Sequence, residues 1–104
     1  VNMRYLGMIS ADEVDQYIHR PDVLIIDLRC KEEYMQMHIE GSRNIPYDEF
    51  ECMCLPRNKL IVLYCDRGAS SLVIGRELAG CGYCVKSVTG GIHAYRGKYL
   101  VKSE

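Results

Sequence analysis

The residues best suited to chemistry form a short loop, Cys65-Asp66-Arg67-Gly68-Ala69-Ser70. It follows residues 60–64, an apolar, β-branched-rich run typical of a buried parallel strand. It precedes residues 71–79, whose apolar side chains recur at helical spacing. The glycine and the small residues allow the backbone to curl with several N–H groups pointing inward. A thiol above such a nest, at a helix N-terminus, lies in a field that favours its thiolate, so Cys65 is predicted to be a nucleophile rather than an inert buried thiol.

Strands and helices alternate around this loop. Strands are predicted at residues 23–28, 43–46, 60–64 and 85–88. Helices are predicted at residues 10–19, 31–37, 48–54 and 71–79, the first opened by a capping box of Ser10 and Glu13, and a final short helix or tail is predicted around residues 93–95. This alternation predicts an α/β fold with a small, mostly parallel sheet and helices on both faces. Ligands of such sheets bind beyond the carboxyl ends of the strands, which is where Cys65 follows its strand.

Length and composition predict one domain, residues 1–104, of ordinary globular type. Hydrophobic residues make up 48% and charged residues 26%, and the net charge of −1 offers no broad basic surface for nucleic acid. No apolar run approaches the roughly 20 residues of a membrane span, and no signal peptide is visible, so a cytoplasmic protein without membrane contact is expected. The chain begins with Val1 rather than Met, which leaves open whether it belongs to a longer protein.

Six cysteines, at positions 30, 52, 54, 65, 81 and 84, resemble a disulfide framework in number. The predicted strands and helices supply a core without cross-links, and no secretory signal is visible, so reduced thiols are expected. Cys81 and Cys84 form a CxxC without a second pair of ligands at metal spacing. They are interpreted as half-buried structural thiols, as are Cys52 and Cys54, and Cys30 as a bystander. No metal is expected.

Four segments resemble, in order and spacing, the signature motifs of single-domain rhodanese-like sulfurtransferases. They are residues 25–29, with Asp27 and Arg29; residues 33–46, with His38-Ile39-Glu40-Gly41 and Asn44-Ile45-Pro46; residues 64–71, the cysteine loop; and residues 88–95, with Gly90-Gly91. The similarity runs from about residue 9 to residue 97. Three departures from the family pattern, Met37 for glycine, Ser42 for alanine and Tyr95 for tryptophan, are interpreted as packing changes.

The resemblance implies a thiosulfate or persulfide sulfurtransferase with a rhodanese-like fold. Cys65, as thiolate, would attack the outer sulfur of a small anionic donor or low-molecular-weight persulfide, and a thiol or cyanide would then take that sulfur. The candidate substrate-binding residues are Asp66, Arg67, Gly68, Ala69, Ser70 and Ser71. Their N–H groups would stabilise the thiolate and the persulfide, Arg67 would attract the donor, and the Ser70 hydroxyl would reach the sulfur. The mechanism requires no cofactor.

Loop length separates sulfur transfer from phosphate chemistry. Phosphatases and arsenate reductases that resemble this fold need an arginine six residues after the cysteine, where it binds phosphate oxygens. Ser71 stands at that position here, and the next arginine is Arg76, inside the predicted helix. The sequence therefore disfavours a phosphatase.

Asp66 bears on the choice of donor, because a carboxylate beside the thiolate opposes an anionic substrate. Arg67 offsets part of this charge, and we expect weak use of thiosulfate and a persulfide as donor. A second function class stays open: a persulfide carrier or interaction module without turnover, served by a cysteine desulfurase or a sulfur-acceptor protein. The presence of Cys65 argues against an inactive scaffold.

Other conspicuous polar residues have structural interpretations. Asp27 and Arg29 are expected to form a pair that fixes the loops beneath the site. His38 is expected to be a hydrogen-bonded histidine at a turn, and His19 and His93 are expected at the surface.

Overall fold

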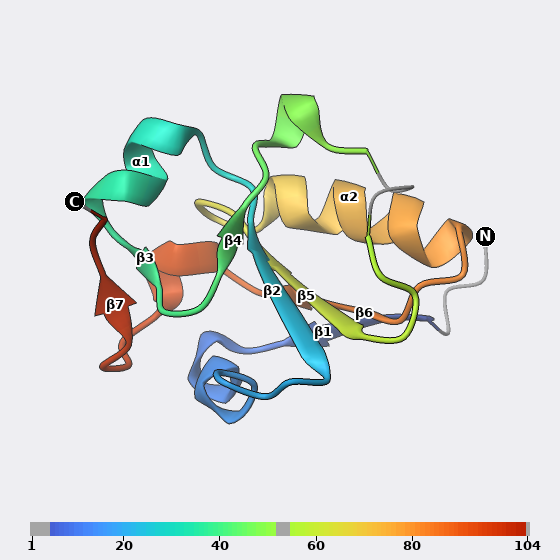
Figure 1. The fold of residues 1–104 in the computed structure, drawn as a ribbon, viewed down its shortest axis with the longest axis horizontal. Coiled ribbons are helices and arrows are strands. Elements are labelled where there is room, and N and C mark those ends of the chain that lie inside the picture. The colour runs from blue at the N-terminus through green and yellow to red at the C-terminus, as the bar shows by residue number, and fades with distance from the viewer. Residues whose placement is uncertain (1–4, 52–54, 104) are drawn as a thin grey trace.

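The computed structural model describes residues 5–51 and 55–103. Within these residues the main sheet consists of β1 (Leu6–Ile9), β2 (Val23–Asp27), β4 (Arg43–Asn44), β5 (Leu60–Tyr64) and β6 (Val85–Val88). The strands are all parallel and lie in the order β1-β6-β5-β2-β4 (Figure 1). A separate antiparallel pair joins β3 (His38–Ile39) to β7 (Leu100–Val101). The predicted, mostly parallel sheet is therefore confirmed.

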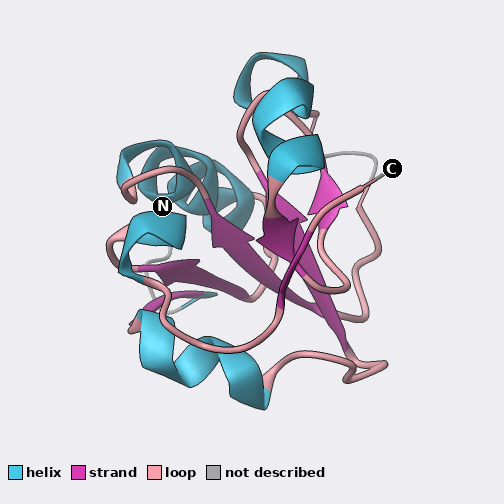
Figure 2. Cartoon of the chain, turned by 90° about the vertical axis from the view of Figure 1, so that its left-hand side faces the viewer, coloured by secondary structure: helices cyan, strands magenta, loops and turns pink. Residues whose placement is uncertain are grey.

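Helical segments cover both faces of the sheet (Figure 2). On one face α2 (Ala69–Gly80) packs against β5, β6 and β1. On the other face lie two 3₁₀ helices in mutual contact, η2 (Ala11–Gln16) and η5 (Gly91–Ala94). The other helices of the described residues are α1 (Lys31–Gln36) and η3 (Tyr47–Glu49). Within the described residues, no helix has the length and apolar character needed to cross a membrane.

Two apolar layers arise because neighbouring residues of a strand point to opposite faces. On β2, Ile25 joins the layer under η2 and η5, and Ile26 joins the layer under α2. On β5, Val62 and Leu63 divide in the same way. Strands buried on both faces need continuous apolar runs, which is why these two segments are recognisable in the sequence.

The observed elements depart from the predicted ones at helix ends and in short strands. The bounds of β5 and β6 are as predicted, whereas η2 is a 3₁₀ helix that ends at Gln16 rather than at residue 19. The helix predicted at residues 48–54 is represented by η3, which ends at Glu49. Residues 52–54 of the predicted helix lie outside the described residues, and so do the cysteines predicted there to be structural thiols, Cys52 and Cys54. Neither the two-residue strands β3 and β7 nor β1, whose short apolar run contains Gly7, were predicted.

The carboxyl ends of β2, β4 and β5 meet at one edge of the sheet. Asp27, the last residue of β2, is paired with Tyr64 of β5 and with Asn44 of β4. Beyond the pairing, the Leu28 N–H donates to the Tyr64 carbonyl at 2.9 Å. The segments that follow these strands therefore lie side by side, and one of them is the cysteine loop.

Candidate active site

Cys65 is the first residue after β5, between the neighbouring strands β2 and β6. Cys65 is only 5% exposed and packs in the apolar layer beneath α2. The helix begins at Ala69, so the sulfur lies between the end of a central strand and the start of the longest helix. This is the position that the strand–loop–helix pattern predicts.

The sulfur has two close polar neighbours. The Gly68 N–H donates to Cys65 Sγ at 3.0 Å, and the Ser71 hydroxyl oxygen lies 3.7 Å from Sγ. Gly68 has a φ of +108°, a conformation that side chains rarely adopt, and a Cβ there would lie 3.1 Å from the Gly90 nitrogen. The glycine is therefore needed both for the turn and for the N–H that reaches the sulfur.

The hydroxyl beside the sulfur belongs to Ser71, whereas the sequence suggests that Ser70 supplies it. Ser71 is the third residue of α2 and is fully buried, whereas Ser70 is half-buried and Ala69 is exposed. The first turn of the helix thus directs Ser71 inward toward the sheet. The Ser71 hydroxyl also contacts the Gly68 carbonyl at 3.2 Å and the Ser87 hydroxyl at 2.8 Å.

The double-glycine turn after β6 holds the loop from the other side. The Ile92 N–H donates to the Cys65 carbonyl at 2.9 Å, and the His93 N–H donates to the Asp66 carbonyl at 3.2 Å. A Cβ on Gly91, whose φ is +60°, would overlap both carbonyl groups. The close approach of two backbones therefore explains why a glycine stands at position 91.

Asp66 is paired with His93. The His93 Nε2 lies 3.0 Å from Asp66 Oδ1, and each side chain is about half exposed, 49% and 50%. Arg67, which was expected to offset the Asp66 charge, is exposed and is not the ion-pair partner of Asp66. His93 was predicted only as a surface residue, and the adjacent double glycine was the signal that could have placed it beside the loop.

A groove of about 540 Å³ opens beside the Asp66–His93 pair. It contains both signs of charge on apolar walls. The lining residues are Arg29, Glu33, Met37, Asp66, Ile92, His93, Tyr95, Arg96 and Leu100. The groove therefore offers contacts to both cationic and anionic groups.

Asp27 and Arg29 form the structural pair that the sequence predicts. The Arg29 guanidinium donates to both carboxylate oxygens of Asp27, and the closest N–O distance is 2.9 Å. Burial alone would lower the pKa of Arg29, but the Asp27 carboxylate outweighs it and raises this pKa above its ordinary value. Arg29 Nη2 also donates to the Met37 carbonyl, so the pair ties the end of α1 to β2.

Tyr64 and His38 anchor the segment that follows α1. The Tyr64 hydroxyl accepts from the Ile39 N–H at 3.0 Å and shares a hydrogen bond with Ser42 Oγ at 3.0 Å. Burial raises the pKa of the Tyr64 phenol well above its ordinary value. His38 Nδ1 lies 2.7 Å from the Tyr34 carbonyl, and its ring stacks on that of Tyr34, which confirms its structural role.

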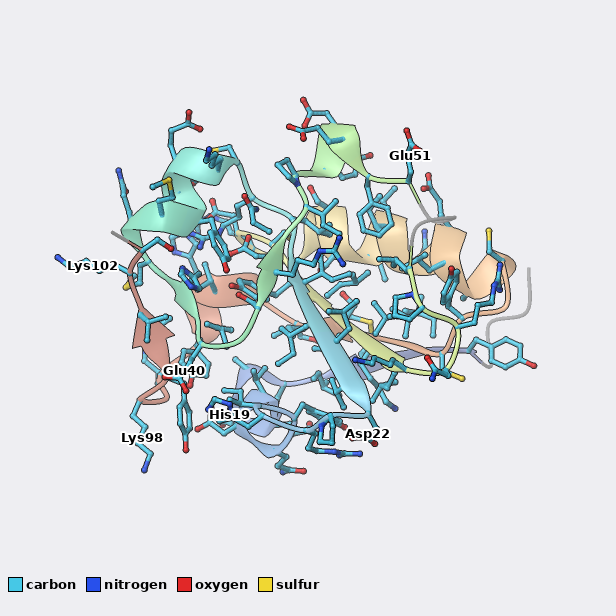
Figure 3. The ribbon with its side chains drawn as sticks, viewed as in Figure 1. His19, Asp22, Glu40, Glu51, Lys98 and Lys102 are labelled. Carbon is cyan, nitrogen blue, oxygen red and sulfur yellow. The ribbon has the colours of Figure 1, made fainter. Side chains whose placement is uncertain are left out.

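The remaining candidates lie away from the loop. His19 is exposed, and its Nε2 lies 2.5 Å from Glu40 Oε2, well away from α2 (Figure 3).

Four cysteines of the described residues, Cys30, Cys65, Cys81 and Cys84, are free thiols. The prediction that Cys81 and Cys84 are half-buried is wrong, because both are exposed. Within residues 5–51 and 55–103, no three metal-ligating side chains gather.

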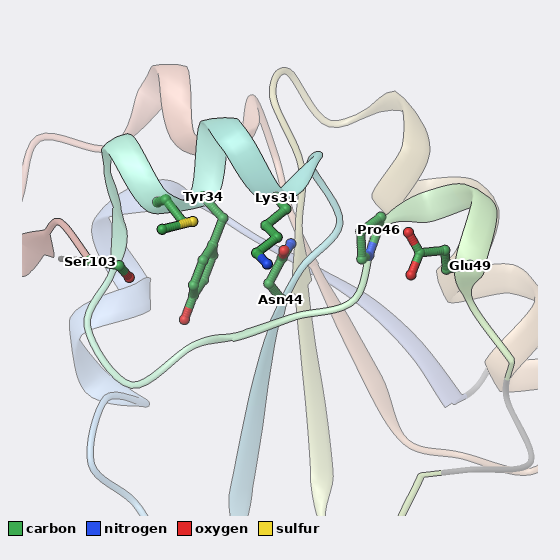
Figure 4. Close-up of a pocket in the computed structure, with 7 residues that line it drawn as sticks. Lys31, Tyr34, Asn44, Pro46, Glu49 and Ser103 are labelled. Carbon is green, nitrogen blue, oxygen red and sulfur yellow. The ribbon is translucent and has the colours of Figure 1, made fainter.

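A second hollow of about 480 Å³ lies between α1 and η3 and contains no residue of the cysteine loop (Figure 4). It is lined by Lys31, Tyr34, Met35, Asn44, Pro46, Glu49 and Ser103. The Asn44 amide donates to the carbonyl oxygens of Asp27 at 3.1 Å and Arg29 at 2.9 Å. This wall therefore braces the ends of β2 and β4 and is not part of the candidate site.

Comparisons with known proteins agree with this architecture. A family model described as the rhodanese-like domain matches residues 10–98. The chain is 41% identical over 75 residues to a tRNA sulfurtransferase of Desulfurococcus amylolyticus, which covers 72% of this chain and 15% of that protein. It is 31% identical over 99 residues to a tRNA uridine(34) hydroxylase of Yersinia pestis, which covers 86% of this chain and 28% of that protein. The chain thus spans less than a third of the length of these curated relatives.

Among solved structures, a rhodanese-like domain protein of Staphylococcus aureus superposes with a TM-score of 0.82 and 25% identity. The alignment covers 94% of this chain and 99% of that one. The parallel sheet, the cysteine loop at its carboxyl edge and the match over residues 10–98 lead to one assignment. The chain belongs to the rhodanese-like domain family.

Proposed function

We propose that this domain is a sulfurtransferase that moves sulfane sulfur through a persulfide on Cys65. The observation that carries the proposal is the Cys65 sulfur at the carboxyl end of β5, 3.0 Å from the Gly68 N–H at the start of a helix. An N–H aimed at sulfur favours the charged thiolate, and the same group serves a charged persulfide. The family membership and the relative named as a tRNA sulfurtransferase support this class of reaction.

The proposed reaction has two steps. The Cys65 thiolate attacks the outer sulfur of thiosulfate or a persulfide, a Cys–S–S bond forms, and sulfite or the donor thiolate leaves with the electrons of the broken S–S bond. An acceptor thiolate or cyanide then attacks the terminal sulfur and regenerates the Cys65 thiolate. Neither step requires an external oxidant or reductant. The chemistry needs a reduced Cys65, which fits the cytoplasmic location that we propose.

The groove beside the loop supports a low-molecular-weight persulfide as donor in preference to thiosulfate. Asp66 presents a half-exposed carboxylate at its rim, and His93 and Arg96 contribute cationic or hydrogen-bonding groups. The ammonium and carboxylate of an amino-acid persulfide match these opposite charges, whereas a dianion meets the Asp66 carboxylate. Arg67, an exposed residue of the loop, can guide either donor.

A second candidate function is a persulfide carrier that receives sulfur from a cysteine desulfurase or passes it to an acceptor protein. It is supported by the small share that the chain represents of the curated relatives, because in them this domain is one part of a larger protein. We propose that the domain itself handles sulfur and not nucleic acid, since its net charge is −1.

The test is the intact mass of the protein after incubation with thiosulfate, with cysteine persulfide, or with a cysteine desulfurase and cysteine. The proposal expects a gain of one sulfur atom that cyanide removes and that Cys65→Ser abolishes. Cys30→Ser, at an exposed thiol, is the matched control and should keep the gain. A gain from the desulfurase alone would favour the carrier, and a gain that survives Cys65→Ser would refute both functions.

A further inference from the structure

Two fully buried serines continue the contacts of the Cys65 sulfur: Ser71 lies beside the sulfur, and Ser87 bonds to Ser71. Ser71 belongs to α2 and Ser87 to β6, and their hydroxyl oxygens are 2.8 Å apart. They are polar exceptions in the otherwise apolar layer beneath α2, which contains Leu63, Ile74 and Val85. A buried hydroxyl is costly unless it is hydrogen-bonded, so the presence of Ser87 in this layer needs a reason.

The Ser71 and Ser87 hydroxyls together have two protons to donate. The Ser71 hydroxyl has one proton and three neighbours, namely the Cys65 sulfur, the Gly68 carbonyl and the Ser87 hydroxyl. Within the described residues, the Ser87 hydroxyl bonds only to that of Ser71. The arrangement in which Ser87 donates to Ser71 leaves the single Ser71 proton available for the sulfur or for the Gly68 carbonyl.

This arrangement suits both forms of the nucleophile. The neutral thiol donates to Ser71 Oγ, and Ser71 then donates to the Gly68 carbonyl. When the thiol has lost its proton to solvent, the Ser71 hydroxyl turns and donates to the thiolate. The Ser87 hydroxyl polarises Ser71 in the donating state, because linked hydrogen bonds strengthen one another.

We propose that Ser87 is a positioning residue that acts through Ser71 to stabilise the Cys65 thiolate. The inference rests on the proposed role of Cys65 as a nucleophile. It adds Ser87 of β6, which lies 16 positions after Ser71 in the sequence. Loss of the Ser87 hydroxyl leaves Ser71 without its donor and favours the thiol. The effect is therefore a smaller thiolate fraction at a given pH with the fold retained.

The experiment measures alkylation of Cys65 by iodoacetamide over a range of pH, without any sulfur donor. Cleavage after Lys59 and Arg67 releases residues 60–67, in which Cys65 is the only cysteine, so its modification can be followed separately. In Ser87→Ala we expect alkylation at neutral pH to slow by about twofold to tenfold and its pH profile to move to higher pH. Ser42→Ala is the matched control, because Ser42 is a buried serine bonded to Tyr64 and not to the sulfur.

The double variant separates action through Ser71 from a general packing effect. If Ser87 acts through Ser71, Ser87→Ala has no further effect on the pH profile in a Ser71→Ala background. Equal effects in the two backgrounds, or an unchanged profile in Ser87→Ala, would overturn the proposal even if the melting temperature falls. Persulfide formation by the unmodified chain is measured separately, so a failure of the proposed function would be recognised as such.

Discussion

In the proposed reaction, the Cys65 sulfur is stabilised by one backbone N–H and one hydroxyl. Gly68 supplies the first because its backbone is left-handed, and Ser71 supplies the second because it lies in the first turn of a helix that packs on the sheet. Neither group carries a formal charge. The only charged residue of the loop that forms an ion pair within the described chain is Asp66, with His93. We therefore propose that the loop separates two tasks: neutral hydrogen-bonding groups stabilise the sulfur, and the charges of Asp66 and His93 select the sulfur donor.

Gly68→Ala is expected to reduce both stability and persulfide formation. The left-handed conformation alone costs an alanine about 1 kcal/mol, and its Cβ would also crowd the Gly90 nitrogen at 3.1 Å. Gly41→Ala is the matched control, because Gly41 has a φ of +82° with open space around it. Urea denaturation should show a loss in both variants, whereas persulfide formation should fall only in Gly68→Ala. Equal activities in the two variants would contradict the role of the Gly68 N–H.

Asp66→Asn is expected to increase the kcat/KM for thiosulfate by about threefold to tenfold, because a carboxylate no longer repels the dianion. The gain should shrink at high salt, since the site is half exposed. Asp12→Asn, in the first turn of η2, provides a control with the same change in net charge. An equal gain with an uncharged alkyl persulfide as donor would show that charge is not the cause.

At the scale of elements, the parts of the candidate site that lie within one continuous segment could be predicted from the sequence. β5, the loop and α2 are consecutive, and their apolar patterns locate Cys65 without further information. Ser87 and His93 reach the loop from β6 and η5, across the sheet or across a turn. Strand alternation alone does not show that the Ser87 hydroxyl meets that of Ser71. The sequence predicts helices near all three 3₁₀ segments, but not their type or their exact bounds, because a single short turn has no reliable period.

The Asp27–Arg29 pair joins β2 to the end of α1, so its loss should destabilise the edge that carries the site. Arg29→Gln leaves the fully buried Asp27 carboxylate without its cation and should cost about 3–5 kcal/mol of unfolding free energy. Arg20→Gln is the control, because the Arg20–Asp22 pair is exposed and should hardly affect the denaturation midpoint. Similar midpoints for the two variants would mean that the buried pair contributes no more than a surface pair.

The whole molecule should lose stability in strongly alkaline solution. Burial, followed by the hydrogen bond to Asp15, raises the pKa of Tyr95 to about 12 from its ordinary value of about 10. A group whose pKa is higher in the folded state stabilises the fold below its unfolded pKa, and this contribution is lost as pH rises through the folded pKa. The raised pKa of Tyr64 acts in the same direction.

Tyr95→Phe tests this linkage. The variant lacks the 2.6 Å hydrogen bond to Asp15, so it should melt below the wild-type chain at neutral pH. The difference in melting temperature should narrow between about pH 10 and pH 12, where the wild-type chain alone loses the Tyr95 contribution. Tyr47→Phe, at a 46% exposed tyrosine, should show no such narrowing. A constant difference for Tyr95→Phe across this range would argue against the linkage.

The strand order β1-β6-β5-β2-β4 has a consequence for how the chain acquires its structure. Among the described strands, β1 pairs with β6 alone, so residues 6–9 cannot pair until residues 85–88 are in place. Closing so long a loop is entropically costly, and parallel pairing of this kind is slow. Because β2 and β5 precede β6 in the chain, they can associate first, and Cys65 is then exposed until Ser87 and Gly91 take their places beside it. We therefore expect the Cys65 thiol to be more open to oxidants while the chain folds than in the finished domain, where pairing of β6 with β5 and β1 encloses it.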